Sequence, residues 1–147
     1  MKDLTQKQIE DIRKNFDKVN WRNICFRKRL SEDFIREFSD KVDWGYVSFN
    51  QKLSEPFIRE FTDKVDWIYI SRYQKLSENF IREFFDKVDW NNICDHQVLF
   101  EEFIYEFYDK ANWKLLCKNK KYNFKDPPKH VKLHIALNHR ELLGYFK

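Results

Sequence analysis

Glycine and proline are scarce: the 147 residues include only two glycines and three prolines. Hairpins and sandwiches need many turn residues, so this scarcity favours helices joined by tight polar turns over an all-β fold. Two glycines also provide no glycine-rich loop of the kind that cradles a phosphate group. The composition therefore predicts an all-α protein without a nucleotide-binding loop.

Long hydrophobic runs and cysteine pairs are also missing. No apolar run approaches the 18 or so residues that a membrane helix requires, and the first residues, MKDLTQKQIEDIRK, lack the apolar segment of a signal peptide. The three cysteines are an odd number without a CxxC motif, which is typical of a reducing compartment. We expect a cytoplasmic protein without a membrane segment.

Aromatic residues are abundant, at 18% of the chain, although the mean hydropathy of −0.80 is polar. A buried aromatic side chain removes about 150–250 Å² from water, worth roughly 4–6 kcal/mol before the entropy cost. Disordered segments contain few aromatic residues. The sequence therefore predicts one folded domain with an aromatic core.

The chain contains five copies of a 23-residue unit, each marked by one tryptophan: Trp21, Trp44, Trp67, Trp90 and Trp113. The second copy reads LSEDFIREFSDKVDWGYVSFNQK, and the third reads LSEPFIREFTDKVDWIYISRYQK. A repeat of this length is the signature of a solenoid, in which each unit buries its apolar side against its neighbours.

Each unit is predicted to hold two short helices. Apolar residues recur every four positions in its first half, as one stripe of a helix of roughly ten residues: Leu30, Phe34, Phe38 and Val42. Ser31 is placed to cap this helix, and Pro56 fits only the first turn of its counterpart. A second helix of roughly eight residues is expected to begin at Asp43. Helices this short are marginal alone, so the fold class predicted is an all-α solenoid.

The two ends differ from the middle. Residues 1–29 form a degenerate N-terminal capping repeat, since Asp11 and Asn15 replace the phenylalanines of the stripe. Residues 30–121 are four tandem repeats. Residues 122–147 are expected to close the stack with a helix from about residue 128 to 143, whose apolar side carries Val131, Ile135, Leu142 and Leu143.

The string LSE-x-FIREF-x-DKVDW followed by YIS-x-YQK resembles a tandem repeat found in proteins of giant DNA viruses and some phages. The resemblance is close over residues 30–98, loose over 99–121 and weak over 6–29. It departs at Tyr105, which replaces arginine, and at Ala111-Asn112, which replace Val-Asp. The resemblance implies a viral origin, and hence the host cytoplasm, but brings no site residues with it.

No residue cluster predicts catalysis. Carboxylates are numerous but recur in every copy, whereas an active site is unique; Arg36/Glu37 and Asp40/Lys41 are expected to form solvated ion pairs between stacked helices. The cysteines share one position, four residues after the tryptophan, where other copies have serine, and are predicted to be small packing residues: Cys25, Cys94 and Cys117. We therefore expect no enzyme.

Metal and cofactor sites are weighed in the same way. His130 and His134 lie four residues apart on a predicted helix and could share a metal ion, but no carboxylate motif accompanies them. A solvated or docking face is the favoured interpretation. We predict neither a metal site nor a cofactor.

Positions that vary between copies are the candidates for partner binding, because repeat proteins vary the residues that face their partners. Five are apolar or aromatic where their counterparts are often polar, and these form the predicted protein-binding set: Ile68, Tyr73, Phe85, Tyr105 and Tyr108. The alternative, weighed equally, is that these side chains pack against the C-terminal segment.

A second functional alternative is nucleic-acid or nucleotide binding through the two basic ends of the chain. Its candidate residues are Arg27, Lys28, Arg29, Lys118, Lys120, Lys121, Lys125 and Lys129. The acidic middle weakens this alternative because it repels a strand laid along the repeats. The favoured hypothesis is a non-enzymatic protein-interaction module. If the chain is of viral or phage origin, the expected role is that of an inhibitor that binds a host defence protein.

Overall fold

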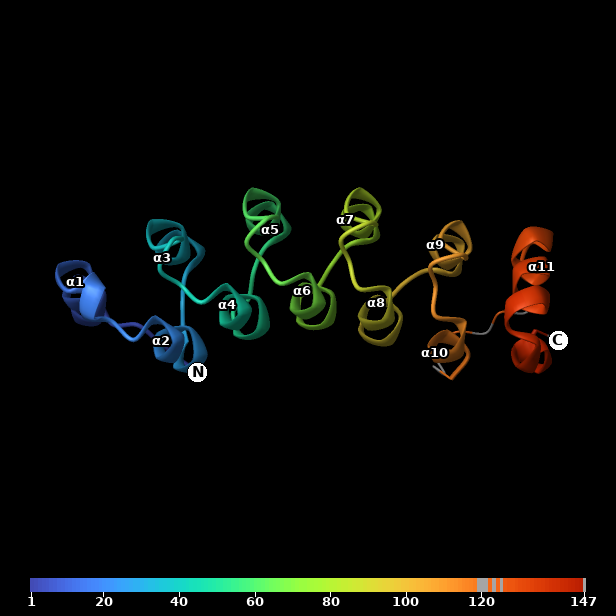
Figure 1. Cartoon of the computed structure of the whole chain (residues 1–147), viewed down its shortest axis with the longest axis horizontal. Helices are drawn as coiled ribbons and strands as arrows, with labels where there is room; N and C mark the ends of the chain where they lie inside the picture. The colour runs from blue at the N-terminus through green and yellow to red at the C-terminus, as the bar shows by residue number, and fades with distance from the viewer. Residues whose placement is uncertain (119–121, 123, 125, 147) are drawn as a thin grey trace. The chain divides into compact units, whose positions relative to one another are not determined.

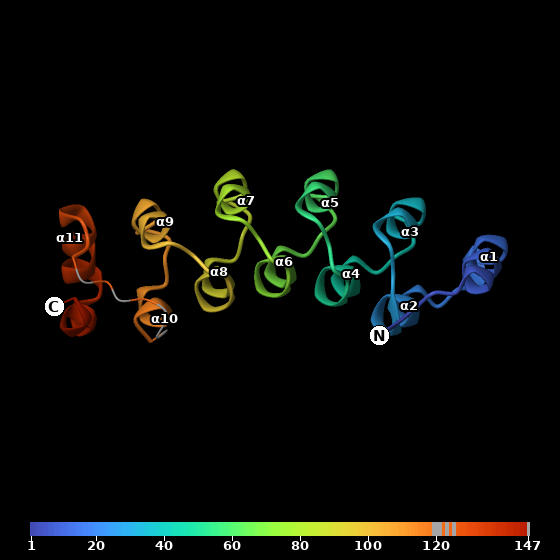
Figure 2. The same ribbon diagram turned by 180° about the vertical axis from the view of Figure 1, so that it is seen from behind.

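The computed structural model describes residues 1–118, 122, 124 and 126–146, and they form an all-α helical-repeat solenoid. The chain divides into two compact units, residues 1–74 and 75–147. In each unit the first and second helices of successive repeats form two rows (Figure 1), which the reverse view also shows (Figure 2). The predicted fold class is confirmed.

Unit 1 holds the first three repeats. Its helices are α1 (Gln6–Lys14), α2 (Trp21–Arg27), α3 (Glu32–Glu37), α4 (Trp44–Asn50), α5 (Glu55–Glu60) and α6 (Trp67–Tyr73), with a 3-10 helix η1 at Phe16–Lys18. Strands β1 (Lys2–Asp3) and β2 (Lys28–Arg29) pair in parallel over two residues each.

Unit 2 holds the last two repeats and the C-terminal segment. Its helices are α7 (Glu78–Glu83), α8 (Trp90–His96), α9 (Glu101–Glu106), α10 (Trp113–Lys118) and α11 (Lys129–Asn138), followed by the 3-10 helix η2 (Arg140–Tyr145). Among the residues that the structure describes, no helix is long and apolar enough to cross a membrane.

Side-chain caps set where the helices begin, as the sequence predicts. The Ser31 hydroxyl accepts a hydrogen bond from the Phe34 N–H at 3.2 Å, and the Asp43 carboxylate accepts one from the Tyr46 N–H at 3.1 Å. Such bonds satisfy the backbone donors that the first turn of a helix leaves unpaired. Both predicted caps of the second copy are therefore confirmed.

The first helix of each repeat is shorter than predicted, six residues instead of ten in α3. The tryptophan explains the early end. The Trp44 indole N–H donates to the Ser39 carbonyl at 2.9 Å, a carbonyl that a continuing helix would pair with a backbone N–H. The chain then turns, but the apolar stripe remains buried through Val42.

The C-terminal helix is also shorter than predicted. α11 ends at Asn138 instead of about residue 143, because side chains take over the last carbonyls. Asn138 donates to the His134 carbonyl at 2.9 Å, and Arg140 donates to that of Ala136 at 3.3 Å. Val131, Ile135 and Leu142 are buried as expected, but Leu143 lies in η2 and is exposed, which corrects that part of the predicted apolar side.

Buried glutamines join neighbouring repeats. The Gln51 side chain accepts from the Leu30 N–H at 2.8 Å and donates to the Cys25 and Lys28 carbonyls, both at 2.9 Å. Gln74 repeats this pattern one copy later, on Leu53, Ser48 and Gln51. Each glutamine therefore replaces the backbone pairing that the turns between the helices lack.

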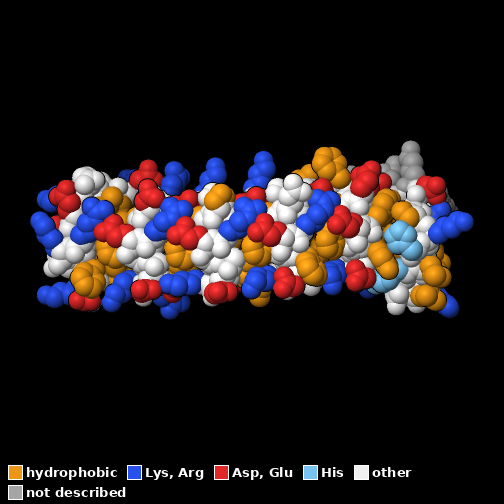
Figure 3. Space-filling view, turned by 90° about the horizontal axis from the view of Figure 1, so that it is seen from above, with side chains coloured by type: hydrophobic (Ala, Val, Ile, Leu, Met, Phe, Trp, Pro, Cys, Tyr) orange, Lys and Arg blue, Asp and Glu red, His pale blue; other side chains and the backbone are white. Residues whose placement is uncertain are grey.

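The predicted ion pairs between stacked helices are present. Arg13 contacts Glu37 and Arg36 contacts Glu60, each at 2.7 Å, and Lys64 contacts Asp40 at 2.8 Å. The Arg13 hydrogen bond lowers the pKa of the Glu37 carboxyl below its usual value. Figure 3 shows the basic and acidic side chains alternating on this face of each unit. Exposed pairs of this kind contribute little stability each.

An exposed aromatic face as candidate binding site

The second helices of unit 1 present aromatic side chains on their outer surface. The inner side of these helices is fixed by the repeat, since Val47, Ser48 and Gln51 are buried on α4. Residues three or four positions apart share one side of a helix. On the outer side lie the residues that we call the aromatic face: Phe26 on α2, Tyr46 and Phe49 on α4, and Tyr69 and Tyr73 on α6.

The rings of the aromatic face contact one another across successive helices. Phe26 and Tyr46 meet edge to face with their ring centres 5.4 Å apart, and Phe49 meets Tyr69 at 5.5 Å and Tyr73 at 4.7 Å. Four of these five side chains are exposed, and Tyr46 is half-buried. These contacts restrict the rings before any partner arrives, which reduces the side-chain entropy that binding has to remove.

Arginines flank the aromatic face. An Arg22 N–H donates to the Tyr46 hydroxyl at 3.2 Å, and its guanidinium lies 5.3 Å from the centre of that ring. The hydrogen bond raises the pKa of Arg22, so the group is a permanent cation. Arg72 lies 5.4 Å from the Tyr73 ring in the same way. The face is therefore both aromatic and basic.

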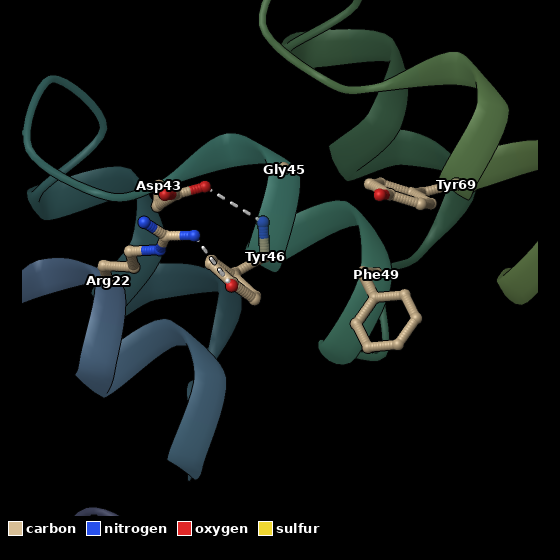
Figure 4. Close-up of a pocket in the computed structure, with 6 residues that line it drawn as sticks. All are labelled: Arg22, Asp43, Gly45, Tyr46, Phe49 and Tyr69. Atoms are coloured by element: carbon tan, nitrogen blue, oxygen red, sulfur yellow. Dashed lines mark hydrogen bonds between the residues drawn. The ribbon is translucent and has the colours of Figure 1, made fainter.

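A recess of about 370 Å³ opens in the aromatic face (Figure 4). It is lined by Arg22, Asp43, Gly45, Tyr46, Phe49 and Tyr69, which come from three consecutive repeats. Its volume lies at the small end of the range of ligand pockets.

The same surface is polar on α8 of unit 2. On α8 the residues equivalent to Tyr69 and Tyr73 are Asn92 and His96, and Asp95 takes the place of Phe49. The repeat itself therefore does not require aromatic residues here. A structural role would apply to every copy, so their restriction to unit 1 points to binding.

Two of the five predicted protein-binding residues lie on α6, one of the three helices that carry the aromatic face. Tyr73 belongs to the aromatic face and is 45% exposed, and Ile68 on α6 is 57% exposed. Both side chains lie in unit 1 and are accessible to a partner.

The other three predicted residues lie in unit 2, where two of them pack against the C-terminal segment. The Tyr108 ring lies 5.1 Å from the rings of both His130 and His134. Tyr105 is half-buried, lies 6.0 Å from the Phe124 ring and donates to Glu101 at 3.3 Å; burial raises the pKa of its hydroxyl to about 12. Tyr105 and Tyr108 therefore follow the alternative stated in the sequence analysis, packing against the C-terminal segment. Phe85 is 44% exposed and remains accessible.

The basic residues of the nucleic-acid alternative are spread over both units. Lys120, Lys121 and Lys125 lie outside the described residues. Arg27 is exposed, Lys28 is half-buried in β2, and Arg29 lies 3.7 Å from the Asp3 carboxylate. Lys118 and Lys129 are exposed in unit 2. Of Arg27, Lys28 and Arg29, only Arg27 is both exposed and located on a helix of the aromatic face.

The cysteines fit the packing role that the sequence predicts. Cys25 and Cys94 are buried, and the Cys94 sulfur accepts a hydrogen bond from the Asn112 N–H at 3.3 Å. Ser48 accepts the equivalent bond from the Asp66 N–H at 2.9 Å, so the shared position needs a small acceptor. Burial raises the pKa of Cys94 and of Cys117 to about 11, which disfavours the reactive thiolate.

Sequence reasoning missed most of the aromatic face, namely Phe26, Tyr46, Phe49 and Tyr69. The signal was present, because Tyr46 and Phe49 are three residues apart on one predicted helix and Tyr69 and Tyr73 are four apart. This signal was missed because each set of equivalent positions in the five copies was considered separately from the others. Only the stacking of repeats brings Phe49 against rings of the following copy.

Comparisons with protein-family models, with curated proteins and with solved structures find no match for this chain. The candidate site therefore depends on its own geometry.

Proposed function

We propose that this chain is a non-enzymatic scaffold that binds another protein through the aromatic face of α2, α4 and α6. The observation that carries the proposal is the set of touching, solvent-exposed rings on three successive helices of unit 1. Tyrosine flanked by arginine is the composition of interface hot spots, where a few side chains supply most of the binding energy.

The wider setting of this proposal comes from the repeat. The resemblance to viral and phage repeats makes a host protein the expected partner, in the cytoplasm, and its inhibition the expected consequence. Repeat scaffolds suit this role because they present an extended surface whose residues vary without changing the buried positions.

The test replaces aromatic residues with those that the chain itself carries at the same positions on α8. The double variant Tyr69→Asn, Tyr73→His copies Asn92 and His96, so the repeat accepts both substitutions. We expect it to lose a partner that the wild-type protein retains in affinity purification from host-cell extract, since each lost anchor costs about 2 kcal/mol or more.

The matched control is Phe100→Ser, which removes an exposed aromatic residue outside the aromatic face. It should retain the partner, and circular dichroism should show unchanged helix content for both variants. Equal retention by the double variant and the control would contradict the proposal. Binding of oligonucleotides in a mobility-shift assay, weakened by salt and unaffected by the double variant, would favour the basic ends instead.

A further inference from the structure

The recess in the aromatic face is lined by a glycine, Gly45, where every other copy has a larger residue. Gly45 occupies the second position of α4, and the same position carries arginine, isoleucine, asparagine or lysine in the other copies: Arg22, Ile68, Asn91 and Lys114. Gly45 is one of only two glycines in the chain. Gly45 lines the recess beside Tyr46 and Phe49, and it has no side chain of its own to occupy that space.

The backbone does not demand glycine here. No described residue has a positive φ angle, so Gly45 uses none of the conformational freedom peculiar to glycine. A Cβ atom at Gly45 would approach only the Asp43 side-chain oxygen, at 3.3 Å. In the next copy Asp66 caps its helix beside Ile68 without difficulty, accepting from the Ile68 N–H at 3.0 Å. A larger side chain at this position is therefore compatible with the backbone and would extend from the wall of the recess.

The walls of the recess combine apolar and charged groups. Tyr46, Phe49 and Tyr69 offer ring surfaces, while Arg22 and Asp43 lie together at one end (Figure 4). Rings of this kind suit an apolar side chain. The guanidinium of Arg22 has five N–H donors arranged to receive a carboxylate, and one of them is bonded to Tyr46.

The charge of the surrounding surface selects for acidic partners. Helices α2, α4 and α6 contain three arginines, Arg22, Arg27 and Arg72, and no Asp or Glu. All three arginines are exposed. Asp43 and Asp66, at the starts of α4 and α6, cap these helices and accept backbone N–H groups.

We propose that the recess at Gly45 binds an apolar side chain of an acidic linear segment in the partner protein, with a carboxylate of that segment on Arg22. This inference depends on the proposed function and specifies the chemistry of its partner. An acidic peptide fits better than a nucleic acid, because the ring-lined recess suits an apolar side chain and a single carboxylate is enough to reach Arg22. A nucleic acid carries a charge on every nucleotide, and the Asp43 carboxylate at the same end of the recess repels each of them.

The test fills the recess with the residue found at this position in the next copy. The wild-type protein is used to select binders from a phage-displayed library of random linear peptides. We expect selected peptides to share Asp or Glu residues around one apolar residue. Gly45→Ile should weaken their binding about tenfold or more, measured by fluorescence polarisation, with an unchanged or higher melting temperature.

Arg22→Ala tests the charged end of the recess. Loss of a charge-assisted hydrogen bond should weaken the same peptides about tenfold and reduce the salt dependence of their binding. The matched control is Arg13→Ala, which removes an exposed arginine on α1 outside the aromatic face and should leave peptide binding unchanged.

The remaining outcomes overturn the inference. Peptides that bind Gly45→Ile as tightly as the wild type would show that the recess is not their site. Selection of peptides without acidic residues, or selection of none, would reject the acidic segment, as would displacement of the peptides by a single-stranded oligonucleotide. If a protein partner depends on Tyr69 and Tyr73 but not on Gly45, the proposed function stands and this inference fails.

Discussion

At the scale of single residues, the most informative position is a polar one in the core. Gln51 is buried, and its side-chain amide makes three hydrogen bonds to the backbone of two repeats. A buried polar group of this kind costs stability unless it is paired, and here each bond also pairs a backbone group at the junction between two repeats. The glutamine therefore fixes the register between neighbouring repeats.

We expect Gln51→Met to lower the free energy of unfolding by about 2–4 kcal/mol. Methionine has a similar length but leaves the Leu30 N–H and two carbonyls unpaired, and each unsatisfied buried group costs about 1–3 kcal/mol. Urea denaturation followed by circular dichroism measures the change. Lys52→Met, at the exposed neighbouring position, is the control and should change stability by less than about 0.5 kcal/mol. Equal midpoints for the two variants would show that the glutamine is not a structural link.

Residue roles were predictable where a pattern within one copy decides them. The stripe from Leu30 to Val42 and the caps Ser31 and Asp43 follow from spacing alone, and all are confirmed. The role of Gln51 was not predictable, although its place on the buried side of its helix was. Its partners lie at the start of its own repeat and at the end of the preceding one, and spacing along one helix carries no information about them.

At the scale of elements, short helices are held by their ends. Seven residues make fewer than two turns, so the backbone groups left unpaired at each end are a large fraction of the total. The fifth repeat differs from its neighbours here. Phe100 replaces the capping serine of α9, and no side-chain hydrogen bond caps that helix. In this respect α9 differs from α3, α5 and α7, the first helices of the three preceding repeats, each of which has a serine cap.

We expect Phe100→Ser to raise the free energy of unfolding by about 0.5–2 kcal/mol, the usual value of a serine cap. The phenylalanine ring is 74% exposed and therefore contributes little burial to lose. Thermal denaturation measures the gain. The reverse change, Ser54→Ala, removes the bond from the Phe57 N–H and should destabilise by about 1 kcal/mol. A destabilised Phe100→Ser variant would indicate that the exposed ring has a packing partner in the fold.

Helix lengths were less predictable than helix starts. A helix start depends on the local sequence, namely a serine or aspartate that caps the first turn, and Ser54 and Asp66 both cap their helices in this way. The end of the first helix depends on the Trp44 indole reaching back to the Ser39 carbonyl, which the apolar period does not reveal because the stripe continues past that point.

At the scale of the molecule, stability comes from contacts between adjacent repeats. The Trp21 ring packs 4.8 Å from Phe38 of the next copy, and Trp44 packs 4.9 Å from Phe61. The repeat pattern predicted such stacking but not its lateral offset, so it could not show that Phe49 meets Tyr73. That offset is why the buried positions were predictable and the aromatic face was not.

The final repeat has no following copy, and the C-terminal segment takes its place. Trp113 is fully buried, unlike the other four tryptophans, and its ring lies 5.5 Å from Phe124 and 5.9 Å from Phe146.

We expect deletion of residues 122–147 to expose Trp113 and Leu116 and to lower the free energy of unfolding by about 3 kcal/mol or more, since burying such a side chain is worth about 1.5–3 kcal/mol. Urea denaturation measures the loss, and increased binding of a hydrophobic dye reports the uncovered surface. Leu137→Lys, an exposed position on α11, is the control and should leave both measurements unchanged. A truncated chain as stable as the full one would mean that the last repeat is complete without its cap, and solenoid ends normally require such a cap.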